Sequence, residues 1–325
     1  MNKQSSAKKL IIQIPCFNEE HTLPQTIADI PRNIEGISEI EILIIDDGSS
    51  DRTVEIAKSL NVNYIVQHTK NQGLARAFCT GLDACLKLGA DIIVNTDGDN
   101  QYAGADIPKL LQPILQGKAD IVVGDRQTNR IKHFSIVKKA LHKFGSLVVR
   151  QLSGTELPDA VSGFRAISRE AALRLNIVSS FSYTVEMIIQ AGRKNMAVTH
   201  VPVAVNPKTR ESHLFKSIPN FIGRQFSTMV RMYSMYSPLK VFFSIGVMLC
   251  FIGVLPIIRF LYFYLSGDGE GHIQSLILGG VFLIIGFITF MIGLVADLIS
   301  FNRQLAEVAL EKIRRLELRD PGNSD

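Results

Sequence analysis

The sequence predicts an α/β domain with a mostly parallel sheet, followed by amphipathic interface helices and a hairpin of two transmembrane helices. Short apolar runs alternate with amphipathic stretches over about residues 8–205, the pattern of a parallel sheet covered by helices on both faces. A short basic and amphipathic stretch comes next. Two uncharged runs, Val241–Ile258 and Ile273–Ala296, then reach the length of about 20 residues that crosses a bilayer.

The strands of the α/β domain are predicted from short runs rich in β-branched residues, and one intervening helix is predicted from its periodicity. The stretch Leu74–Leu88 places its apolar side chains on one helical face. That face consists of Leu74, Ala77, Phe78, Leu82, Cys85 and Leu86. The predicted strands are Leu10–Pro15, Ile40–Asp46, Tyr64–Gln67, Asp91–Thr96 and Asp120–Gly124.

These patterns divide the chain into four segments. They are the α/β domain (1–205), amphipathic juxtamembrane helices (206–240), two transmembrane helices (241–300, at about 241–265 and 273–299) and a charged tail (301–325). Part of a soluble core is the alternative for the juxtamembrane segment. In the tail, Leu305–Leu318 is predicted to be an amphipathic helix for a partner or for the membrane surface.

Positive charge predicts the orientation of the hairpin. The connector Ser266–His272 contains no Lys or Arg, whereas both flanks are rich in them. Positively charged flanks stay in the cytoplasm, so we expect the α/β domain and both termini there. The apolar run Leu10–Ile12 is too short for a signal peptide. A homo-oligomer could form through small residues of the second span, namely Gly279, Gly280, Gly286 and Gly293.

The net charge of +5 and the pI of about 9.0 indicate an anionic partner. A nucleic-acid-binding protein would add a recognition motif, and the sequence contains none. The basic residues lie beside the apolar segments, which favours anionic lipid head groups or phosphates. The cysteines and histidines lack metal-binding spacing. We expect the cysteines to be small buried side chains, and His68, His133, His142 and His213 to lie on the surface.

Two carboxylates one residue apart, Asp97 and Asp99, follow the strand predicted just before them. Ligands of parallel sheets bind at the carboxyl ends of the strands. A pair of oxygen ligands suits Mg²⁺ or Mn²⁺, which would bridge a diphosphate and stabilise it as it leaves. A solvated turn is the competing interpretation of this D-x-D motif, and the surrounding sequence has to decide between them.

Two motifs earlier in the chain supply that context. Ile14–Glu19 begins at the end of the first predicted strand and continues past it, and Ile44–Thr53 does the same at the second. In the latter, Gly48 permits a tight turn and Asp51 can cap the next helix. Asp46 faces the crevice, where a carboxylate can accept hydrogen bonds from a nucleobase or a ribose.

Together with Asp97-Gly98-Asp99, these motifs resemble the inverting family-two glycosyltransferases over about residues 8–205. The resemblance implies a GT-A (Rossmann-like) fold, a UDP- or GDP-linked sugar donor, and Mg²⁺ or Mn²⁺ on Asp97 and Asp99. Phe17 replaces the usual tyrosine, so any hydroxyl contact there is lost. Gly98-Asp99-Asn100 differs from the commoner A-D-L, so the acceptor side of the pocket departs from the family pattern. The nucleotide-sugar residues implied are Pro15, Phe17, Glu19, Asp46, Asp51, Asp97, Asp99 and Gln101.

Further segments are similar to dolichyl-phosphate mannose synthase and to bacterial polyprenyl-phosphate glycosyltransferases. They are Asp99–Tyr102 with Asp106–Pro108, Gly124–Arg126, Asp159–Arg165 and Thr209–Ser217. An anionic lipid phosphate must approach an anionic donor, so cations must offset their repulsion. The predicted lipid-phosphate residues are Arg126, Lys138 (with Lys139 as its alternative), Ser162, Arg210, Ser212 and Lys216.

The expected reaction is a direct displacement with inversion, in which the acceptor phosphate attacks the anomeric carbon of a hexose. A phosphate monoester is already ionised near neutral pH, so Asp159 is expected to be an orienting residue or a weak base, with a structural cap as the alternative. Glu186 matches an acidic position of the family but could equally pack structurally. The expected catalytic residues are Asp99, Asp159, Arg126 and Arg210.

Three other functions compete with this one. A processive polysaccharide synthase carries a Q-x-x-R-W motif, and this chain has no tryptophan. A nucleotidyltransferase needs a glycine-rich phosphate loop where this chain has Pro15–Glu19. A non-catalytic membrane scaffold with a transferase-like domain predicts that the metal carboxylates or the phosphate-binding cations are lost, and the sequence retains them.

Overall fold

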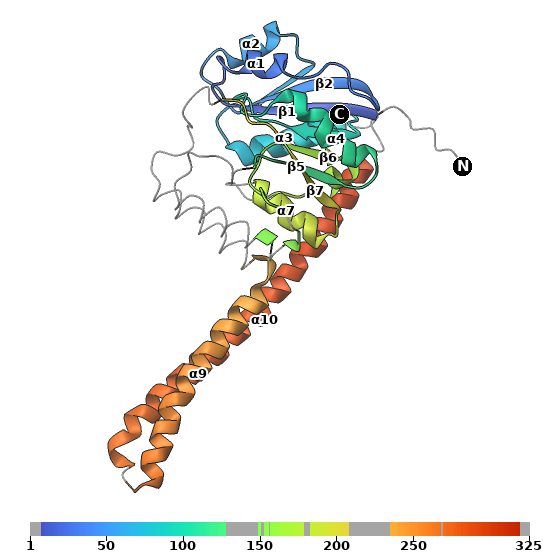
Figure 1. Ribbon diagram of the computed structural model, residues 1–325. Coiled ribbons are helices and arrows are strands. Elements are labelled where there is room, and N and C mark those ends of the chain that lie inside the picture. Colours follow the sequence, from blue (N-terminus) through green and yellow to red (C-terminus); the bar gives the residue numbers. More distant parts are fainter. Residues whose placement is uncertain are drawn as a thin grey trace, which may run out of the picture. The chain divides into compact units, whose positions relative to one another are not determined.

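The computed structural model describes residues 8–127, 149–150, 153–155, 157–178, 183–207, 235–267 and 269–318 (Figure 1). The chain forms two compact units. The first comprises Met1–Arg224 together with Leu310–Asp325, and the second comprises Gln225–Ala309. Most of the predicted juxtamembrane segment, residues 208–234, lies outside the described residues.

Within the described part of the first unit, seven strands form one sheet in the order β3-β2-β1-β4-β6-β5-β7. The five predicted strands are confirmed, with ends shifted by at most three residues. They are β1 (Lys8–Cys16), β2 (Ile37–Asp46), β3 (Tyr64–Gln67), β4 (Ile92–Asn95) and β5 (Ile121–Asp125). The prediction of a mostly parallel sheet is confirmed as well, because among the described strands only β6 (Arg165–Ser168) runs antiparallel, to both β4 and β5. The last strand, β7 (Val198–Pro202), pairs in parallel with β5.

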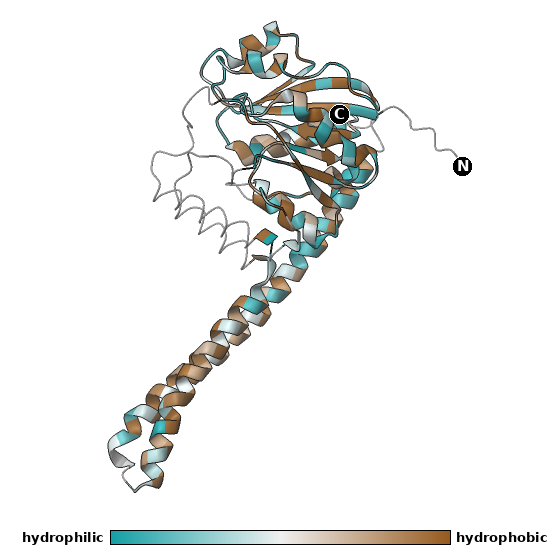
Figure 2. Ribbon diagram, viewed as in Figure 1, coloured by the Kyte–Doolittle hydropathy of each residue, from teal (hydrophilic) through white to brown (hydrophobic). Residues whose placement is uncertain are grey.

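Helices pack on the sheet around a core of aliphatic side chains, seen as brown strands in Figure 2. They are α1 (Leu23–Ala28), α2 (Thr53–Ser59), α3 (Leu74–Lys87), α4 (Ile107–Leu115) after the short 3-10 turn η1 (Gly104–Asp106), α6 (Arg169–Arg174) and α7 (Tyr183–Arg193). The predicted apolar face of α3 is buried except at Leu74. Leu74 is 38% exposed because it begins the helix, directly after the N-cap Gly73.

The carboxyl ends of β1, β2 and β4 meet at one edge of the sheet. Cys16 pairs with Asp46 at the ends of β1 and β2, and Gln13 pairs with Asn95 at the end of β4. The backbone N–H of Asp47 donates to Cys16 O at 2.9 Å, so the loops after β1 and β2 start side by side. The segments that carry the predicted motifs therefore leave the sheet together.

The second unit contains the helices α9 (Pro238–Leu265) and the first part of α10 (Ile273–Glu317), joined through the turn η3 (Glu270–His272). Their most apolar windows have mean hydropathies of 2.7 and 2.6, and only 11% and 17% of those windows is buried. A core helix of a soluble protein would be mostly buried, so the exposure distinguishes these helices from one. Both are long and apolar enough to cross a membrane (Figure 2).

A row of glycines lies where α9 and α10 touch. Gly246 and Gly253 of α9 are buried, as are three glycines of α10. A Cβ at Gly253 would lie 2.8 Å from Gly279 O, and a Cβ at Gly286 would lie 2.6 Å from Cys250 Sγ. We call Gly246, Gly253, Gly279, Gly286 and Gly293 the glycine seam. The spacing of seven residues keeps the seam on one face of each helix.

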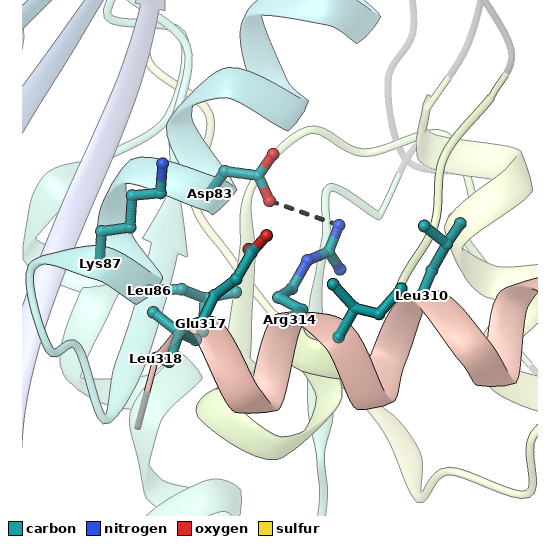
Figure 3. A pocket seen from close by; sticks show the side chains of 8 residues that line it. Asp83, Leu86, Lys87, Leu310, Arg314, Glu317 and Leu318 are labelled. Carbon is teal, nitrogen blue, oxygen red and sulfur yellow. Dashed lines mark ion pairs between the residues drawn. The ribbon is translucent and has the colours of Figure 1, made fainter. Parts of the chain in front are cut away.

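The final turns of α10, from Leu310 to Glu317, and the following Leu318 belong to the first unit. Arg314 donates to Leu175 O at 2.9 Å and to Leu173 O at 3.3 Å, both at the end of α6, and forms an ion pair with Asp83 at 3.4 Å. Figure 3 shows this ion pair beside a pocket of about 220 Å³ between α3 and α10. The predicted tail helix is thus a continuation of α10, and it contacts the α/β unit of its own chain.

Candidate functional site

The loops after β1 and β2 are locked together by hydrogen bonds. The Asn18 N–H donates to Ser49 Oγ at 2.9 Å, and the Ser50 N–H donates back to Asn18 Oδ1 at 2.9 Å. Asp51 accepts hydrogen bonds from the N–H groups of Glu20 at 3.1 Å and Thr53 at 3.0 Å. The N-cap of α2 is Arg52 and not Asp51, so the expected capping role was wrong by one residue; Asp51 instead binds Thr53, the first residue of α2, and ties the two loops together.

The predicted nucleotide residues of these loops differ in exposure. Phe17 is 40% exposed at the end of β1, while Pro15 is buried within that strand. Asp46 is buried and accepts a hydrogen bond from the Ser49 N–H at 3.2 Å. Glu19 is buried and accepts one from Thr22 Oγ1 at 2.6 Å. Among these four residues Phe17 is thus the exposed one, whereas Pro15, Asp46 and Glu19 are buried.

Asp47 holds a third segment against these loops, a role that the sequence did not reveal. Its Oδ1 contacts His68 Nδ1 at 2.7 Å and accepts from the Gln72 N–H at 2.9 Å, and its Oδ2 accepts from the Gly73 N–H at 2.8 Å. The other ring nitrogen of His68 contacts Thr80 Oγ1 at 3.0 Å. The prediction that His68 lies on the surface was wrong, because its side chain is only 8% exposed.

The D-x-D segment follows β4 directly at this edge of the sheet. Asp99 Oδ1 accepts a hydrogen bond from the Gln101 N–H at 3.1 Å, which holds the turn that carries both carboxylates. Burial, and next the charge of Asp99, raise the pKa of Asp97 to about 7. Glu19 adds to this rise, while Arg126 and Arg165 oppose it. Negative charge is thus concentrated around Asp97.

That concentration of carboxylates fits a divalent cation which also binds phosphate. The described residues contain no group of three or more His, Cys, Asp or Glu side chains that could hold a metal ion by themselves. Mg²⁺ is commonly held by one or two carboxylates, with the remaining ligands supplied by substrate phosphates and water. Asp97 and Asp99 can supply the two carboxylate ligands that such a site takes from the protein.

Arg126 and Asp159 form a bidentate ion pair. Arg126 Nε donates to Asp159 Oδ2 at 2.7 Å and Nη2 donates to Oδ1 at 3.0 Å. Asp159 is 1% exposed. Burial lowers the pKa of Arg126, but the hydrogen bond to Asp159 and the surrounding negative charges outweigh it, so the net shift is upward. The pair leaves Asp159 poorly placed to receive a substrate proton and fixes the guanidinium whose charge acts on Asp97.

The structure describes only some of the other predicted site residues. Ser162 is fully buried in the loop that follows Asp159. Glu186 is fully buried and accepts hydrogen bonds from the Val178 N–H and from Gln190 Nε2, as a structural role requires. The predicted lipid-phosphate residues Lys138, Arg210, Ser212 and Lys216, with the alternative Lys139, lie outside the described residues.

The pocket of Figure 3 is separate from these residues. It lies beside Asp83, Leu86 and Lys87 at the end of α3, just before β4 begins. It therefore opens at the amino ends of the strands, whereas the D-x-D segment follows their carboxyl ends. The candidate site is the carboxylate and arginine cluster, and the pocket is not part of it.

Comparison with known proteins identifies the family to which the chain belongs. The family model described as "Glycosyl transferase family 2" matches residues 11–175, which is more than half of the chain. A UDP-N-acetylglucosamine–dolichyl-phosphate N-acetylglucosaminyltransferase of Methanococcus voltae is 32% identical over 222 residues, covering 61% of this chain and 86% of that protein. An undecaprenyl-phosphate mannosyltransferase of Micrococcus luteus is 26% identical over 205 residues, covering 60% and 82%.

The fold has solved counterparts. Glucosyl-3-phosphoglycerate synthase from Mycobacterium tuberculosis, crystallised with Mn²⁺, UDP and glucosyl-3-phosphoglycerate, superimposes with a TM-score of 0.52 at 20% identity. The match covers 70% of this chain and 79% of that one. The same enzyme was also solved with Mg²⁺ and UDP. The likeness confirms the predicted GT-A fold.

Proposed function

Because the chain belongs to glycosyl transferase family 2, we propose that it transfers a hexose from a nucleotide-diphosphate sugar to a polyprenyl phosphate, with inversion at the anomeric carbon. The observation that carries the proposal is the juxtaposition of two charges at one edge of the sheet. The carboxylates of Asp97 and Asp99 suit a cation bound to the donor, and Arg126 presents a fixed positive charge beside them.

The donor would lie against the loops after β1 and β2. The exposed ring of Phe17 offers a face on which a nucleobase can stack, and Asp46 and Asp51 lie in the adjoining loop. Asp97 and Asp99 would hold the divalent metal, Mg²⁺ or Mn²⁺, next to the diphosphate, with Gln101 at the end of the same turn. When bound, the metal neutralises charge on the leaving diphosphate. UDP- and GDP-linked sugars both remain candidates.

The acceptor phosphate would lie at Arg126. Asp159 occupies one edge of the guanidinium, through Nε and Nη2, and keeps it in one orientation, which reduces the entropy lost when a phosphate binds. An ionised phosphate needs no strong base, so we assign Asp159 an orienting role. Ser162 lies in the same loop. Arg210, Lys138, Ser212 and Lys216 are proposed to complete the cationic surroundings of the lipid phosphate.

Relatives support a polyprenyl-phosphate acceptor but differ in sugar and carrier. One is named for N-acetylglucosamine and dolichyl phosphate, and another for mannose and undecaprenyl phosphate. The helices α9 and α10 suit an acceptor that is confined to a membrane. We propose that the α/β unit and both termini face the cytoplasm, since Lys and Arg are absent from the connector Ser266–His272.

A homo-oligomer through the membrane helices also remains a proposal. Gly279, Gly286 and Gly293 contact α9 within the same chain, whereas a Cβ at Gly280 would have nothing within 4 Å. Gly280 and the exposed apolar side chains beside it are therefore the surface that such an oligomer would use.

A transfer assay tests the proposed function. The full chain in detergent is given dolichyl or undecaprenyl phosphate, Mg²⁺ or Mn²⁺, and a panel of labelled nucleotide sugars. We expect organic-extractable label from one donor, and a loss of at least about 100-fold in Asp99→Ala, because the metal-bound diphosphate loses a ligand. No lipid-linked label from any donor, with the protein folded and binding nucleotide, would contradict the proposal.

A further inference from the structure

The loop that contains Asp159 and Ser162 leads into β6. Side chains of Asn95 and Tyr102 form hydrogen bonds with its backbone. Asn95 Nδ2 donates to Gly163 O at 2.9 Å, and the Gly163 N–H donates to Tyr102 Oη at 3.0 Å. A Cβ at Gly163 would lie 2.9 Å from Asp97 Oδ2, so this loop passes directly beside the D-x-D carboxylate. Its position thus affects both charged groups of the candidate site.

Arg165, the first residue of β6, also holds the loop. Its side chain is fully buried. Nε donates to Ser162 O at 2.7 Å, Nη2 donates to Ala160 O at 2.7 Å, and Nη1 donates to Thr184 O at 2.8 Å in α7. A buried cation is costly unless its donors are satisfied, and only the planar fork of a guanidinium can reach three carbonyls in different directions.

Two of these carbonyls, those of Ala160 and Ser162, lie in the loop just after the residue that orients Arg126. Ala160 follows Asp159 in the chain, and Asp159 binds Arg126 through both carboxylate oxygens. Arg165 therefore acts on Arg126 through two steps, the loop backbone and then the Asp159 carboxylate. The charges of both arginines also act on Asp97.

We propose that Arg165 is a positioning residue, which fixes the loop backbone at Ala160 and Ser162, directly after Asp159, and thereby sets the place of the Arg126 guanidinium beside the D-x-D carboxylates. The inference rests on the proposed function insofar as it concerns sugar transfer. Arg165 itself is enclosed by protein and touches no substrate. Its effect on rate would come from geometry, where an error of about 1 Å can cost on the order of 100-fold.

Arg165→Lys tests the proposal, since it keeps the charge but cannot form the three-way fork. Arg169→Lys is the matched control. Arg169 also donates to backbone carbonyls, Leu86 O at 3.2 Å and Ala90 O at 3.0 Å, but at the start of α6 and outside the candidate site. We expect Arg165→Lys to lower kcat by roughly 10- to 100-fold with the KM for the nucleotide sugar nearly unchanged. Arg169→Lys should leave kcat unchanged.

A double variant tests whether Arg165 acts on the transfer rate through Arg126. If Arg165 acts through Arg126, then Arg126→Lys combined with Arg165→Lys should lower kcat little further than Arg126→Lys alone. Independent, multiplying losses would overturn the proposal. So would a kcat in Arg165→Lys that falls only in proportion to the fraction of unfolded protein, as it would for a merely structural arginine.

Amide hydrogen exchange provides a readout that does not require turnover. The peptide that covers residues 157–164 should exchange faster in Arg165→Lys than in the wild type, and at the wild-type rate in Arg169→Lys. Unchanged exchange there would overturn the positioning role. If the wild-type chain transfers no sugar, the proposed function fails while this measurement still decides the role of Arg165.

A milder variant covers the case in which Arg165→Lys does not fold. Tyr102→Phe removes one hydrogen bond from Gly163 and keeps the ring stacked on Phe164, with centroids 5.1 Å apart. Tyr102→Phe should lower kcat at constant KM and raise the exchange rate of residues 157–164, both by less than Arg165→Lys does. Wild-type kcat and exchange in Tyr102→Phe would then overturn the proposal that this loop must be held in place.

Discussion

Asp47 and Gly48 together hold the segment of Lys70–Gly73 against the loop after β2. The carboxylate of Asp47 accepts the N–H groups of Gln72 and Gly73, and this draws that backbone close to Gly48. A Cβ at Gly48 would lie 2.6 Å from the carbonyl carbon of Lys70. Gly48 also has a φ of +73°, where a side chain is strained even without a neighbour.

Gly48→Ala is expected to destabilise the α/β unit more than Gly89→Ala does. Gly89 has a similar φ of +80°, but its Cβ would meet nothing within 4 Å, so it isolates the cost of backbone strain, about 1–2 kcal/mol. Gly48→Ala adds overpacking of about 1–3 kcal/mol. Thermal unfolding of the two variants in detergent measures the difference, and equal midpoints would contradict the close approach.

Asp159→Asn is expected to separate an orienting role from that of a base. Asparagine keeps the shape but loses the charge and one acceptor for Arg126, so the transfer rate should fall by roughly 10- to 100-fold. Over the pH range in which the ion pair between Asp159 and Arg126 persists, an orienting residue leaves the shape of the pH–rate profile unchanged. Disappearance of an acidic limb from the profile would instead show that Asp159 is a base.

For single residues, the sequence predicts which carboxylates lie near the same edge of the sheet. It does not predict the hydrogen-bond partners that fix the surrounding loops. Asp97, Asp99 and Asp46 follow strands whose ends meet, which topology alone predicts. The partners of Asp47 lie 21 to 26 residues away, and Asn95 and Gly163 are 68 residues apart. Arg165 ends the segment Asp159–Arg165, but the sequence did not predict its role. A buried arginine that binds carbonyls has no recognisable pattern in the sequence.

The elements differ in how clearly their residues mark them. The five strands rich in Ile and Val were predicted, whereas β6 and β7 were not. The strand β6 has four residues and begins with the polar Arg165, and β7 at the sheet edge is partly exposed and ends at Pro202. Both lack the continuous apolar run of a central strand, so only pairing with their neighbours defines them.

The glycine seam predicts how the hairpin responds to larger side chains. Gly286→Leu should force α9 and α10 apart, since a Cβ there would lie 2.6 Å from Cys250 Sγ. Gly280→Leu, on an open face of the same helix, is the control. We expect faster alkylation of Cys250 in Gly286→Leu, with Cys79 as the internal reference. Equal rates in the two variants would mean that the seam does not hold the helices.

At the scale of the whole molecule, the chain returns to the α/β unit after the second apolar helix. The sequence predicted a helix over Leu305–Leu318 but left its contacts open, because charged side chains suit a partner, a membrane surface and a protein face equally. Arg314 meets α6 and Asp83, the latter more than 200 residues earlier, and Arg315 pairs with Glu170. The α/β unit is therefore built from both ends of the chain.

Arg314→Ala should lower the thermal stability of the α/β unit by about 1–2 kcal/mol, because two carbonyls at the end of α6 lose their donor. The exposed Lys312, two residues earlier, provides the control Lys312→Ala. The ion pair with the half-exposed Asp83 adds little. Equal unfolding midpoints for the two variants would contradict the docking of Leu310–Leu318.

The central claim is that a fixed arginine and a pair of metal-binding carboxylates bring an ionised lipid phosphate to a nucleotide sugar. The most direct test compares polyprenyl phosphate with the corresponding free polyprenol as acceptor, in the wild-type chain with its preferred donor and metal. The account predicts lipid-linked sugar from the phosphate alone, because only the phosphate is ionised and can bind Arg126. Equal transfer to the free alcohol would contradict it.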